Sequence, residues 1–538
     1  MNWNNNAARI RREVLVRTAR LALEGSLAEG ADGIAYDMTG PGWEVVRCCV
    51  HHDRAIIRLR AMAALGFAPQ GLADADRPLA EYARAAIARA EGLRAAPRGK
   101  AEDGGAEGSV LSVNDEACNA CVKTRHRVTE GCQGCLARPC KMNCPKGAVS
   151  FREGRAWIDP DKCVDCGLCA RNCPYSAIIK QSVPCEESCP TGALAKDDEG
   201  RERIDPERCI ECGKCLKACP FGAVAESSRI VDAALALKSG RRVVALLAPA
   251  LAVQFPGGFA RLVAALRELG FARVEEAARG ADVTARLEAV ELAERLARKA
   301  EGGFMATSCC PAWKRASRLA GPGVASRVSA TPSPMALGAA QLAREEPESL
   351  VVFVSPCVAK RREAAADPNV YLALTAEELG ALLVAAGLDV AAAEPDQAGA
   401  EERPSAEGRL FAVSGGVAEA VKAASRAAGA PEPQTVAVNG LTKQSLKEIS
   451  LWESSPPEAD LVEVVRAAFD PDWVLLDVVA AHFCRQQGNH LVAQRDFVGP
   501  QVKHVLARPV IQRHKAFHQL VERHDGARTV AVAFPAPL

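Results

Sequence analysis

Cysteine dominates the residues of this chain that could do chemistry. Sixteen of its 22 cysteines lie between positions 118 and 219 of 538 residues. Two runs in this stretch have the form C-x2-C-x2-C-x3-C followed by proline. They are Cys163, Cys166, Cys169 and Cys173, and Cys209, Cys212, Cys215 and Cys219. Three thiolates at this spacing bind one 4Fe–4S cubane, and the fourth cysteine reaches a neighbouring cluster.

Two further sets of four cysteines complete the pattern, and each also ends in a Cys-Pro step. One set is Cys132, Cys135, Cys140 and Cys144, and the other, split by the first complete run, is Cys118, Cys121, Cys185 and Cys189. If neighbouring sets exchange their fourth cysteines, every one of the sixteen is used once. The predicted ligand sets are Cys132, Cys135, Cys140 with Cys173; Cys163, Cys166, Cys169 with Cys144; Cys118, Cys121, Cys185 with Cys219; and Cys209, Cys212, Cys215 with Cys189.

Both complete runs resemble the signature of bacterial ferredoxins. The alternatives are four zinc sites or a disulfide scaffold. Zinc sites usually present separated C-x2-C pairs and do not require the following proline. The spacing therefore favours four 4Fe–4S clusters.

Composition and charge bound the remaining possibilities. The net charge is +1, which favours neither nucleic acid nor an acidic membrane surface as a partner. We find no apolar run of transmembrane length, and the first residues lack a charged-then-apolar signal pattern. These observations predict a cytoplasmic protein, in which cysteines stay reduced and available to metal.

Around the cysteine-rich stretch, the pattern predicts several regions. Residues 1–95 read as helical, with helices over 8–30, up to Gly66 and over 78–94. Adjacent Cys48 and Cys49 lie in this region, and we expect one buried and one half-exposed thiol; an extra cluster or a redox contact is the alternative. The other predicted regions are a linker (96–116), a ferredoxin-like α+β domain (117–228), an α/β domain (229–500) and a polar tail (501–538).

The α/β domain is predicted from apolar runs between alanine-rich stretches. These runs look like buried parallel strands joined by crossover helices, and they cover residues 243–251, 349–354, 410–414, 435–438 and 473–479. Chemistry in open α/β sheets lies beyond the carboxyl ends of strands. Cys310 follows residues 304–308, Cys357 follows residues 351–356 and Cys484 follows the run that ends at Ala481, so their three loops could hold one further cluster.

Two of these loops carry a family resemblance. Residues 307–313, Thr-Ser-Cys-Cys-Pro-Ala-Trp, resemble the first signature of iron-only (FeFe) hydrogenases, TSCCPxW. Residues 356–363, Pro-Cys-Val-Ala-Lys-Arg-Arg-Glu, are similar to the second, PCxxKxxE. The resemblance covers most of residues 8–480 and points to the monomeric group B branch of the family.

The resemblance implies roles for individual residues. Cys310 and Cys357 would ligate the cubane of the H-cluster, and Cys309 would be the proton-relaying thiol beside its two-iron subsite. Lys360 would donate a charge-assisted hydrogen bond to an iron-bound cyanide. The proton path would comprise Glu288, Glu291, Arg295 and Ser329. The spacing of the first three places them on one helical face, for which a surface salt-bridge stripe is the alternative.

The third family signature, ExMxCxxxC, is altered here. The corresponding stretch has Asp477 for Glu, Val479 for Met and Ala481 for the first cysteine. Cys484 falls one residue short of the place of the second cysteine. Real divergence or an altered reading frame would each produce this pattern.

The resemblance implies an enzyme that forms or consumes H2, with electrons relayed through 4Fe–4S clusters. Ferredoxin would be the electron partner, since the chain carries no dinucleotide fingerprint. Hydrogenase maturation proteins would be further partners if the H-cluster is built. The altered third motif favours, as the alternative, a noncatalytic electron-transfer or H2-sensory relative. A third reading is an iron–sulfur assembly factor, against which the doubled Cys309-Cys310 argues.

Overall fold

The computed structural model describes residues 5–69, 77–95, 110–121, 125–298, 304–396, 404–452 and 454–465. They belong to the first of two compact units, which comprises residues 1–479; the second comprises residues 480–538. The predicted strand at 473–479, Cys484 and the polar tail therefore lie outside the described residues. None of the described helices is long and apolar enough to cross a bilayer.

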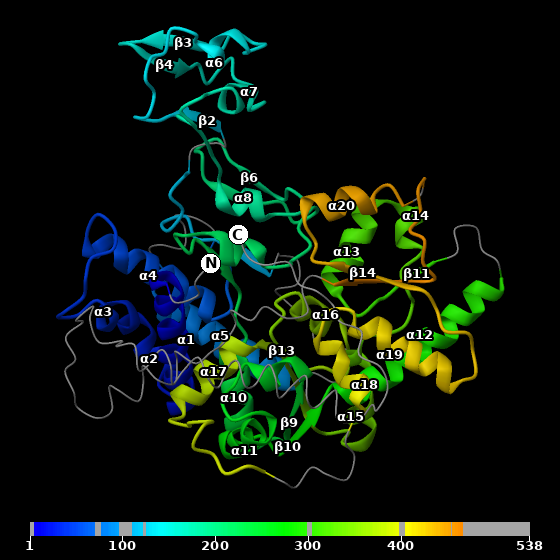
Figure 1. Ribbon diagram of the computed structural model, residues 1–538. Helices are drawn as coiled ribbons and strands as arrows, with labels where there is room; N and C mark the ends of the chain where they lie inside the picture. The colour runs from blue at the N-terminus through cyan, green and yellow to red at the C-terminus, as the bar shows by residue number, and fades with distance from the viewer. Residues whose placement is uncertain are drawn as a thin grey trace, which may run out of the picture. The chain divides into compact units, whose positions relative to one another are not determined.

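Helices make up the described N-terminal region (blue in Figure 1). They are α1 (Asn6–Glu24), α2 (Leu27–Gly30), α3 (Ile34–Met38), α4 (Val50–Ala64) and α5 (Leu79–Ala95), with a 3-10 turn at Ala31–Gly33. The helix predicted over 8–30 is interrupted, because Gly25 adopts a left-handed conformation (φ 77°) and caps α1. The other two predicted helices are confirmed as α4 and α5.

The cysteine-rich region consists of two nested units of short antiparallel strand pairs. The inner unit, residues 125–181, contains β2 (Arg125–Val128), α6 (Pro139–Met142), β3 (Val149–Arg152), β4 (Arg155–Ile158), α7 (Leu168–Arg171) and β5 (Ile178–Gln181). Here β2 pairs with β5, and β3 with β4. The strand β4 directly precedes the first complete cysteine motif.

The outer unit, residues 110–121 and 182–228, flanks the inner unit in sequence. Its elements are β1 (Leu111–Val113), α8 (Pro184–Ser188), β6 (Leu194–Lys196), β7 (Glu202–Ile204), α9 (Lys214–Ala218) and β8 (Val224–Glu226). β6 pairs with β7, and β1 with β8. Residues 111–113, which the sequence assigned to the linker, are thus part of this unit, because Leu111 and Val113 bury their side chains on it.

Two parallel sheets form the α/β region. The four-stranded sheet has the order β10-β9-β12-β13, and the three-stranded sheet has the order β11-β15-β14. The strands are β9 (Val243–Leu247), β10 (Arg273–Glu276), β11 (Met305–Ala306), β12 (Leu350–Ser355), β13 (Leu372–Thr375), β14 (Thr435–Asn439) and β15 (Leu461–Val465). The α/β prediction is confirmed, with β9, β12 and β14 where strands were expected. β14 lies at a sheet edge, and its Val436 is 41% exposed.

The strand predicted at 410–414 is wrong. Residues Leu410–Ala412 form a 3-10 helix that continues α18 (Ala406–Arg409). Ser405 begins this helical segment by accepting a hydrogen bond from Gly408 N. The chain then turns into α19 (Gly416–Ala427) through Gly415, whose φ is 83°. Local capping and this glycine outweigh the apolar run.

The remaining helices flank the sheets and position the site. They are α10 (Ile230–Lys238), α11 (Phe259–Leu269), α12 (Ala278–Ala297), α13 (Pro311–Ala320), α14 (Pro322–Ala325), α15 (Pro334–Glu345), α16 (Lys360–Ala366), α17 (Ala376–Ala385) and α20 (Lys443–Ile449), with a 3-10 helix at Pro249–Val253. α12 packs against both α15 and α19. Gly280 permits the close approach to α15, because a Cβ there would meet Pro334 O at 2.2 Å.

Candidate cysteine clusters and active site

The inner unit gathers its eight cysteines around two cavities. One cavity is lined by Cys132, Cys135, Cys140 and Cys173. The other is lined by Cys144, Cys163, Cys166 and Cys169. Each cavity thus takes three cysteines from one run and the fourth from the other, as in the crossed arrangement predicted from sequence.

A repeated turn places the cysteine that precedes each proline. In all four turns the thiol accepts a hydrogen bond from the backbone N–H four residues later. The donors are Ala148 to Cys144 (3.3 Å), Ala177 to Cys173 (3.4 Å), Ala193 to Cys189 (3.2 Å) and Ala223 to Cys219 (3.4 Å). Hydrogen bonds of this kind favour a thiolate over a thiol and tune any cluster bound to it.

A second repeated feature is a left-handed residue directly before the second cysteine of each set. These residues are Ala120 (φ 42°), Gly134 (φ 59°), Asp165 (φ 52°) and Glu211 (φ 55°). Three of the four have side chains, for which this conformation costs roughly 1–3 kcal/mol each. Successive N–H groups in such turns form concave anion sites. The backbone therefore turns in the same way at every predicted cluster loop, and three of the four turns are strained.

The outer unit buries its thiols more deeply. Cys185, Cys189, Cys209, Cys212 and Cys215 are all buried. Burial and the nearby Glu202 and Cys219 raise the pKa of Cys185 to about 12. Burial also raises the pKa of Cys215, and its neighbours Cys212, Cys209 and Cys189 raise it further. These thiols must lose their protons to bind metal, so binding and deprotonation are coupled.

The loop of Cys209–Cys215 packs directly on the α/β region. Ile210 and Cys212 share a hydrophobic cluster with Trp313, Cys310 and Cys357. Polar contacts hold the same loop. Arg315 Nε donates to Cys209 O (3.0 Å), and Arg362 Nη2 pairs with Glu211 Oε1 (2.6 Å). The loop of Cys209–Cys215 therefore contacts the same hydrophobic cluster as the two cysteines that the sequence assigned to the H-cluster.

Cys309 and Cys310 lie in the loop that follows β11, and Cys310 is the N-cap of α13. The buried Trp313 fixes this loop, since its Nε1 donates to Thr307 O (3.0 Å). Cys357 follows β12. Burial raises the pKa of Cys309 well above its ordinary value, and the nearby carboxyl of Glu288 raises it further. Cys309 therefore holds its proton at neutral pH.

Lys360 connects the two cysteine loops. Its Nζ donates to Cys309 O (3.2 Å), Ser333 Oγ (3.2 Å) and Glu363 Oε2 (2.6 Å). Burial alone would lower the pKa of Lys360, but the charge of Glu363 outweighs it and the pKa is raised. The ammonium group is therefore fixed and charged beside Cys309.

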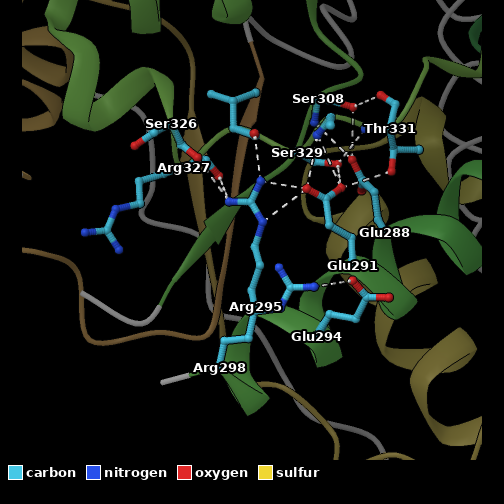
Figure 2. A network of polar contacts seen from close by, with 12 residues as sticks. Glu288, Glu291, Glu294, Arg295, Arg298, Ser308, Ser326, Arg327, Ser329 and Thr331 are labelled. Atoms are coloured by element: carbon cyan, nitrogen blue, oxygen red, sulfur yellow. Dashed lines mark hydrogen bonds and ion pairs between the residues drawn. The ribbon is translucent and has the colours of Figure 1, made fainter. Parts of the chain in front are cut away.

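Glu288 is the buried end of a polar network (Figure 2). Its Oε1 accepts hydrogen bonds from Ser308 N (3.0 Å) and Ser308 Oγ (3.2 Å). Its Oε2 is buried and has no hydrogen bond of normal geometry within the described residues. Burial raises the pKa of Glu288 to about 7. A surface salt-bridge stripe is thus excluded for this residue.

The pKa of Glu291 is shifted in the opposite direction. Its Oε2 accepts from Ser329 Oγ (2.6 Å) and Thr331 Oγ1 (3.2 Å), and Arg295 Nη2 donates to its Oε1 (2.6 Å). Burial would raise its pKa, but these hydrogen bonds and the charge of Arg295 outweigh burial and lower it. Arg295 in turn donates to the Ser326, Arg327 and Val328 carbonyls. Figure 2 shows all four predicted proton-path residues in one network.

Several residues of the site were not predicted. Ser308 and Thr331 complete the Glu288 network, and Glu363 and Ser333 hold Lys360. Ser333 had a usable signal, because Ser followed by Pro marks a helix start, here that of α15. Ser308 and Glu363 belong to the quoted motifs, but their contacts depend on distant segments.

Cys48 and Cys49 do not match their prediction, since both thiols are exposed. They directly precede α4, on a loop held by hydrogen bonds to Asp53. Cys484, the third predicted cubane ligand of the α/β region, lies outside the described residues.

Comparison with known proteins identifies the class. Residues 241–463 match the iron-only hydrogenase large subunit, C-terminal domain; residues 184–223 match the 4Fe-4S dicluster domain, and residues 156–179 the 4Fe-4S binding domain. The two 4Fe-4S domain matches support iron–sulfur clusters in the cysteine-rich region and argue against zinc sites or disulfides. The chain is an iron-only hydrogenase-like protein with ferredoxin-type 4Fe–4S domains, and it has an α/β fold.

Particular relatives match over part of their length. The periplasmic Fe hydrogenase large subunit of Nitratidesulfovibrio vulgaris is 30% identical over 49% of this chain and 66% of its own. Iron hydrogenase 1 of Clostridium pasteurianum is 28% identical over 58% of this chain and 62% of its own. A solved FeFe-hydrogenase structure aligns at 21% identity over 52% of this chain and 93% of that one, with a TM-score of 0.38. This chain thus spans less than two thirds of both curated hydrogenases.

Proposed function

We propose that the protein is an iron–sulfur oxidoreductase that interconverts protons and H2. The observation that carries this proposal is the one hydrophobic cluster that Cys212 shares with Cys310 and Cys357, next in sequence to Cys309 and its carboxylate network. Cysteines that could hold electron-carrying clusters and a hydrogen-bonded network that could carry protons thus come together beside Cys309. Reduction of protons to H2 requires such a meeting point.

For electrons, the sixteen cysteines would hold four 4Fe–4S clusters in the crossed sets predicted from sequence. The two cavities of the inner unit fit this assignment, since each is lined by one complete set. The repeated N–H donors to the Cys-Pro thiols fit anionic ligands. In the outer unit, Cys215 lies near Cys189, Cys209 and Cys212, and Cys121 near Cys118 and Cys219, which are members of the other two sets.

At the active site, Cys310, Cys357 and Cys484 would ligate the cubane of an H-cluster. When bound, this cofactor supplies the iron chemistry that joins two electrons and two protons as H2. Cys309, whose raised pKa keeps its thiol protonated, presents a proton at Sγ. Lys360 orients the Cys309 loop through its carbonyl and keeps a positive charge beside it.

Protons would reach Cys309 through Glu288. Its pKa of about 7 lets this carboxyl gain and lose a proton near neutral pH, and its free Oε2 can take one. Glu291 stays ionised, so its role is to orient Ser329 and Thr331, while Arg295 holds Glu291. The path therefore contains one titrating carboxyl and one fixed carboxylate.

An acidic electron carrier of the ferredoxin type would dock on the inner unit. Residues 125–181 contain ten Lys and Arg against five Asp and Glu, whereas the outer unit contains six against twelve. The inner unit also exposes large apolar side chains close to its cysteines. They are Leu136 (97%), Met142 (78%), Val164 (57%), Tyr175 (54%) and Ile179 (51%). A basic, partly apolar surface over clusters suits transient electron exchange with an acidic protein.

The decisive experiment is infrared spectroscopy of protein matured anaerobically with hydrogenase maturation proteins. Bands of iron-bound carbon monoxide and cyanide, together with H2 evolution, are the expected result. Absence of these bands in protein that still shows 4Fe–4S clusters by electron paramagnetic resonance would overturn the proposal. We place this reaction in the cytoplasm, as the sequence predicts.

The altered third motif supports a second candidate, a noncatalytic electron-transfer or H2-sensory relative. Ala481 stands where the family has a cubane ligand, and Cys484 is displaced by one position. An intact reading frame around codons 470–490 favours this candidate, and a frame change that restores C-x3-C favours the enzyme.

A further inference from the structure

The exposed pair Cys48 and Cys49 has no place in the proposed electron or proton routes. Both thiols sit on the loop that leads into α4, and this loop is fixed rather than loose. The buried carboxylate of Asp53 accepts hydrogen bonds from Trp43 Nε1 (2.9 Å), Val46 N (2.9 Å) and Arg47 N (3.1 Å). The thiols are therefore held at a defined position on the surface.

Cys49 occupies the N-cap position of α4, a helix of 15 residues. The backbone N–H groups of His52 and His51 face its thiol and lower the pKa of Cys49 below its ordinary value. A helix N-terminus stabilises a thiolate, and an exposed thiolate is the reactive form of cysteine. Cys49 has the surroundings of an attacking thiol.

Cys48 has a base of its own in His52. The Nε2 atom of His52 lies 2.9 Å from Glu116 O, and a carbonyl oxygen only accepts, so Nε2 carries the proton. The neutral ring then has its lone pair on Nδ1, which lies 3.2 Å from Cys48 Sγ. When the ring takes the Cys48 proton, the Glu116 carboxylate, 3.7 Å from Nε2, stabilises the imidazolium. The two sulfurs are 3.9 Å apart.

We propose that Cys49, Cys48 and His52 form a thiol–disulfide exchange site whose substrates are disulfides. The Cys49 thiolate attacks one sulfur of the substrate, the substrate S–S bond breaks, and one substrate thiolate leaves. Cys48 gives its proton to His52 and attacks Cys49 Sγ. The second substrate thiolate leaves and takes the proton from His52. The first thiolate takes from solvent the proton that Cys49 had released, so the substrate disulfide is reduced by two electrons to two thiols and the pair is oxidised to a Cys48–Cys49 disulfide.

A disulfide between neighbours in sequence suits a reversible site. Consecutive Cα atoms are about 3.8 Å apart, which is shorter than the roughly 4.4–6.8 Å that disulfides usually span. Such a disulfide is strained and easily reduced, as labile regulatory or catalytic disulfides are. The site also borders the outer unit, since Arg47 Nη2 donates to Asn119 Oδ1 (3.2 Å) and His52 contacts Glu116.

The test uses the full-length, cluster-loaded protein under anaerobic conditions with a large excess of oxidised glutathione, because an easily reduced Cys48–Cys49 disulfide forms only when the substrate disulfide is in excess. Intact mass and released glutathione are measured. Wild type is expected to release two glutathione molecules and lose two hydrogens. Cys48→Ser should stop at a single glutathione adduct, and Cys49→Ser should react at least about tenfold more slowly. His52→Ala should accumulate the adduct before release of the second glutathione.

The matched control is His51→Ala, which removes a neighbouring exposed imidazole and should react as wild type does. Cluster absorbance, unchanged in each variant, shows that the variants fold. A Cys49→Ser protein that reacts at the wild-type rate would overturn the proposal. So would a Cys48→Ser protein that still releases two glutathione molecules.

Discussion

The proposed electron route and the proposed proton route reach Cys309 through different architectures. The electron route consists of thiols on short repeated loops. In each set, a residue in the left-handed conformation precedes the second cysteine, and a backbone N–H donates to the sulfur before the proline. The proton route consists of polar side chains drawn from one helix face and from the loops after β11 and around Ser329. The first is local in sequence, and the second is assembled by packing.

This difference has a physical basis in what each route carries. Electrons tunnel between clusters, so their carriers need only proximity and a fixed environment, which a repeated loop provides. Protons move between hydrogen-bonded atoms about 2.6–3.2 Å apart, so each donor must face its acceptor. The electron route should therefore tolerate changes at its exposed end, whereas the proton route should fail when one atom is replaced.

The largest effect is expected at Cys309, where the routes meet. Cys309→Ser replaces a thiol with a hydroxyl of much higher pKa and should lower H2 turnover by about 1,000-fold or more. Iron content should stay at the wild-type value. Loss of iron would show instead that Cys309 is a ligand.

Glu288→Gln tests the proton route alone. The amide keeps the shape of the side chain but cannot carry a proton, so H2 turnover should fall by about 100-fold. Exchange of H2 with D2O needs protons but no external electrons, and it should fall equally. Glu294→Gln is the matched control on the same helix, because the Glu294 side chain is 61% exposed and pairs with the exposed Arg298; both activities should be unchanged.

The same variant should change the pH dependence of stability. The folded protein holds the pKa of Glu288 at about 7 against an ordinary value of 4.5, so between these values the folded state binds more protons than the unfolded state. Stability must therefore fall as pH rises through this window, by about 3 kcal/mol in all. Glu288→Gln has no carboxyl to ionise at this position, so its stability should not fall in this way. The urea midpoint of the variant, relative to that of wild type, should be higher at about pH 8 than at about pH 5. An equal difference at both pH values would refute burial of an ionising carboxyl.

Cys212→Ser tests the electron route where it touches the active site. Carrier-dependent H2 evolution should fall by about 10- to 100-fold, in the range seen when a metal site loses a supporting group. Exchange of H2 with D2O should be largely retained, because it bypasses the ferredoxin-type clusters. An equal loss of both activities would show that Cys212 supports the active site itself.

The smallest effect is expected at the exposed end of the electron route. Lys141 is exposed on the inner unit, and Lys141→Glu should raise the KM for an acidic carrier about two- to fivefold, with less effect at high salt. Lys447→Glu, an equal charge change on α20, serves as the control and should leave KM unchanged. Equal shifts for both variants would place the carrier elsewhere.

Residue spacing and composition were enough to predict those features that depend on neighbouring residues, namely the cluster loops and the buried strands. Cysteine spacing and the Cys-Pro step specified the cluster loops, because ligands three residues apart can meet without help from the rest of the chain. The apolar runs of β9 and β12 specified parallel strands, since a strand buried on both faces must be apolar throughout. The apolar run at 410–414 led to the wrong prediction of a strand, because capping by Ser405 and the turn at Gly415 outweighed its composition.

The pKa shifts of the site residues and the exposure of Cys48 and Cys49 depend instead on how distant segments pack. Spacing placed Glu288 and Glu291 on one face of a helix, yet different environments shift their pKa values in opposite directions. That difference depends on Ser308 and Ser329, which arrive from other segments. Likewise, the pattern did not show that Cys48 and Cys49 lie exposed beside His52. Burial and hydrogen bonding between distant segments set pKa values, and a linear pattern of residue types does not contain them.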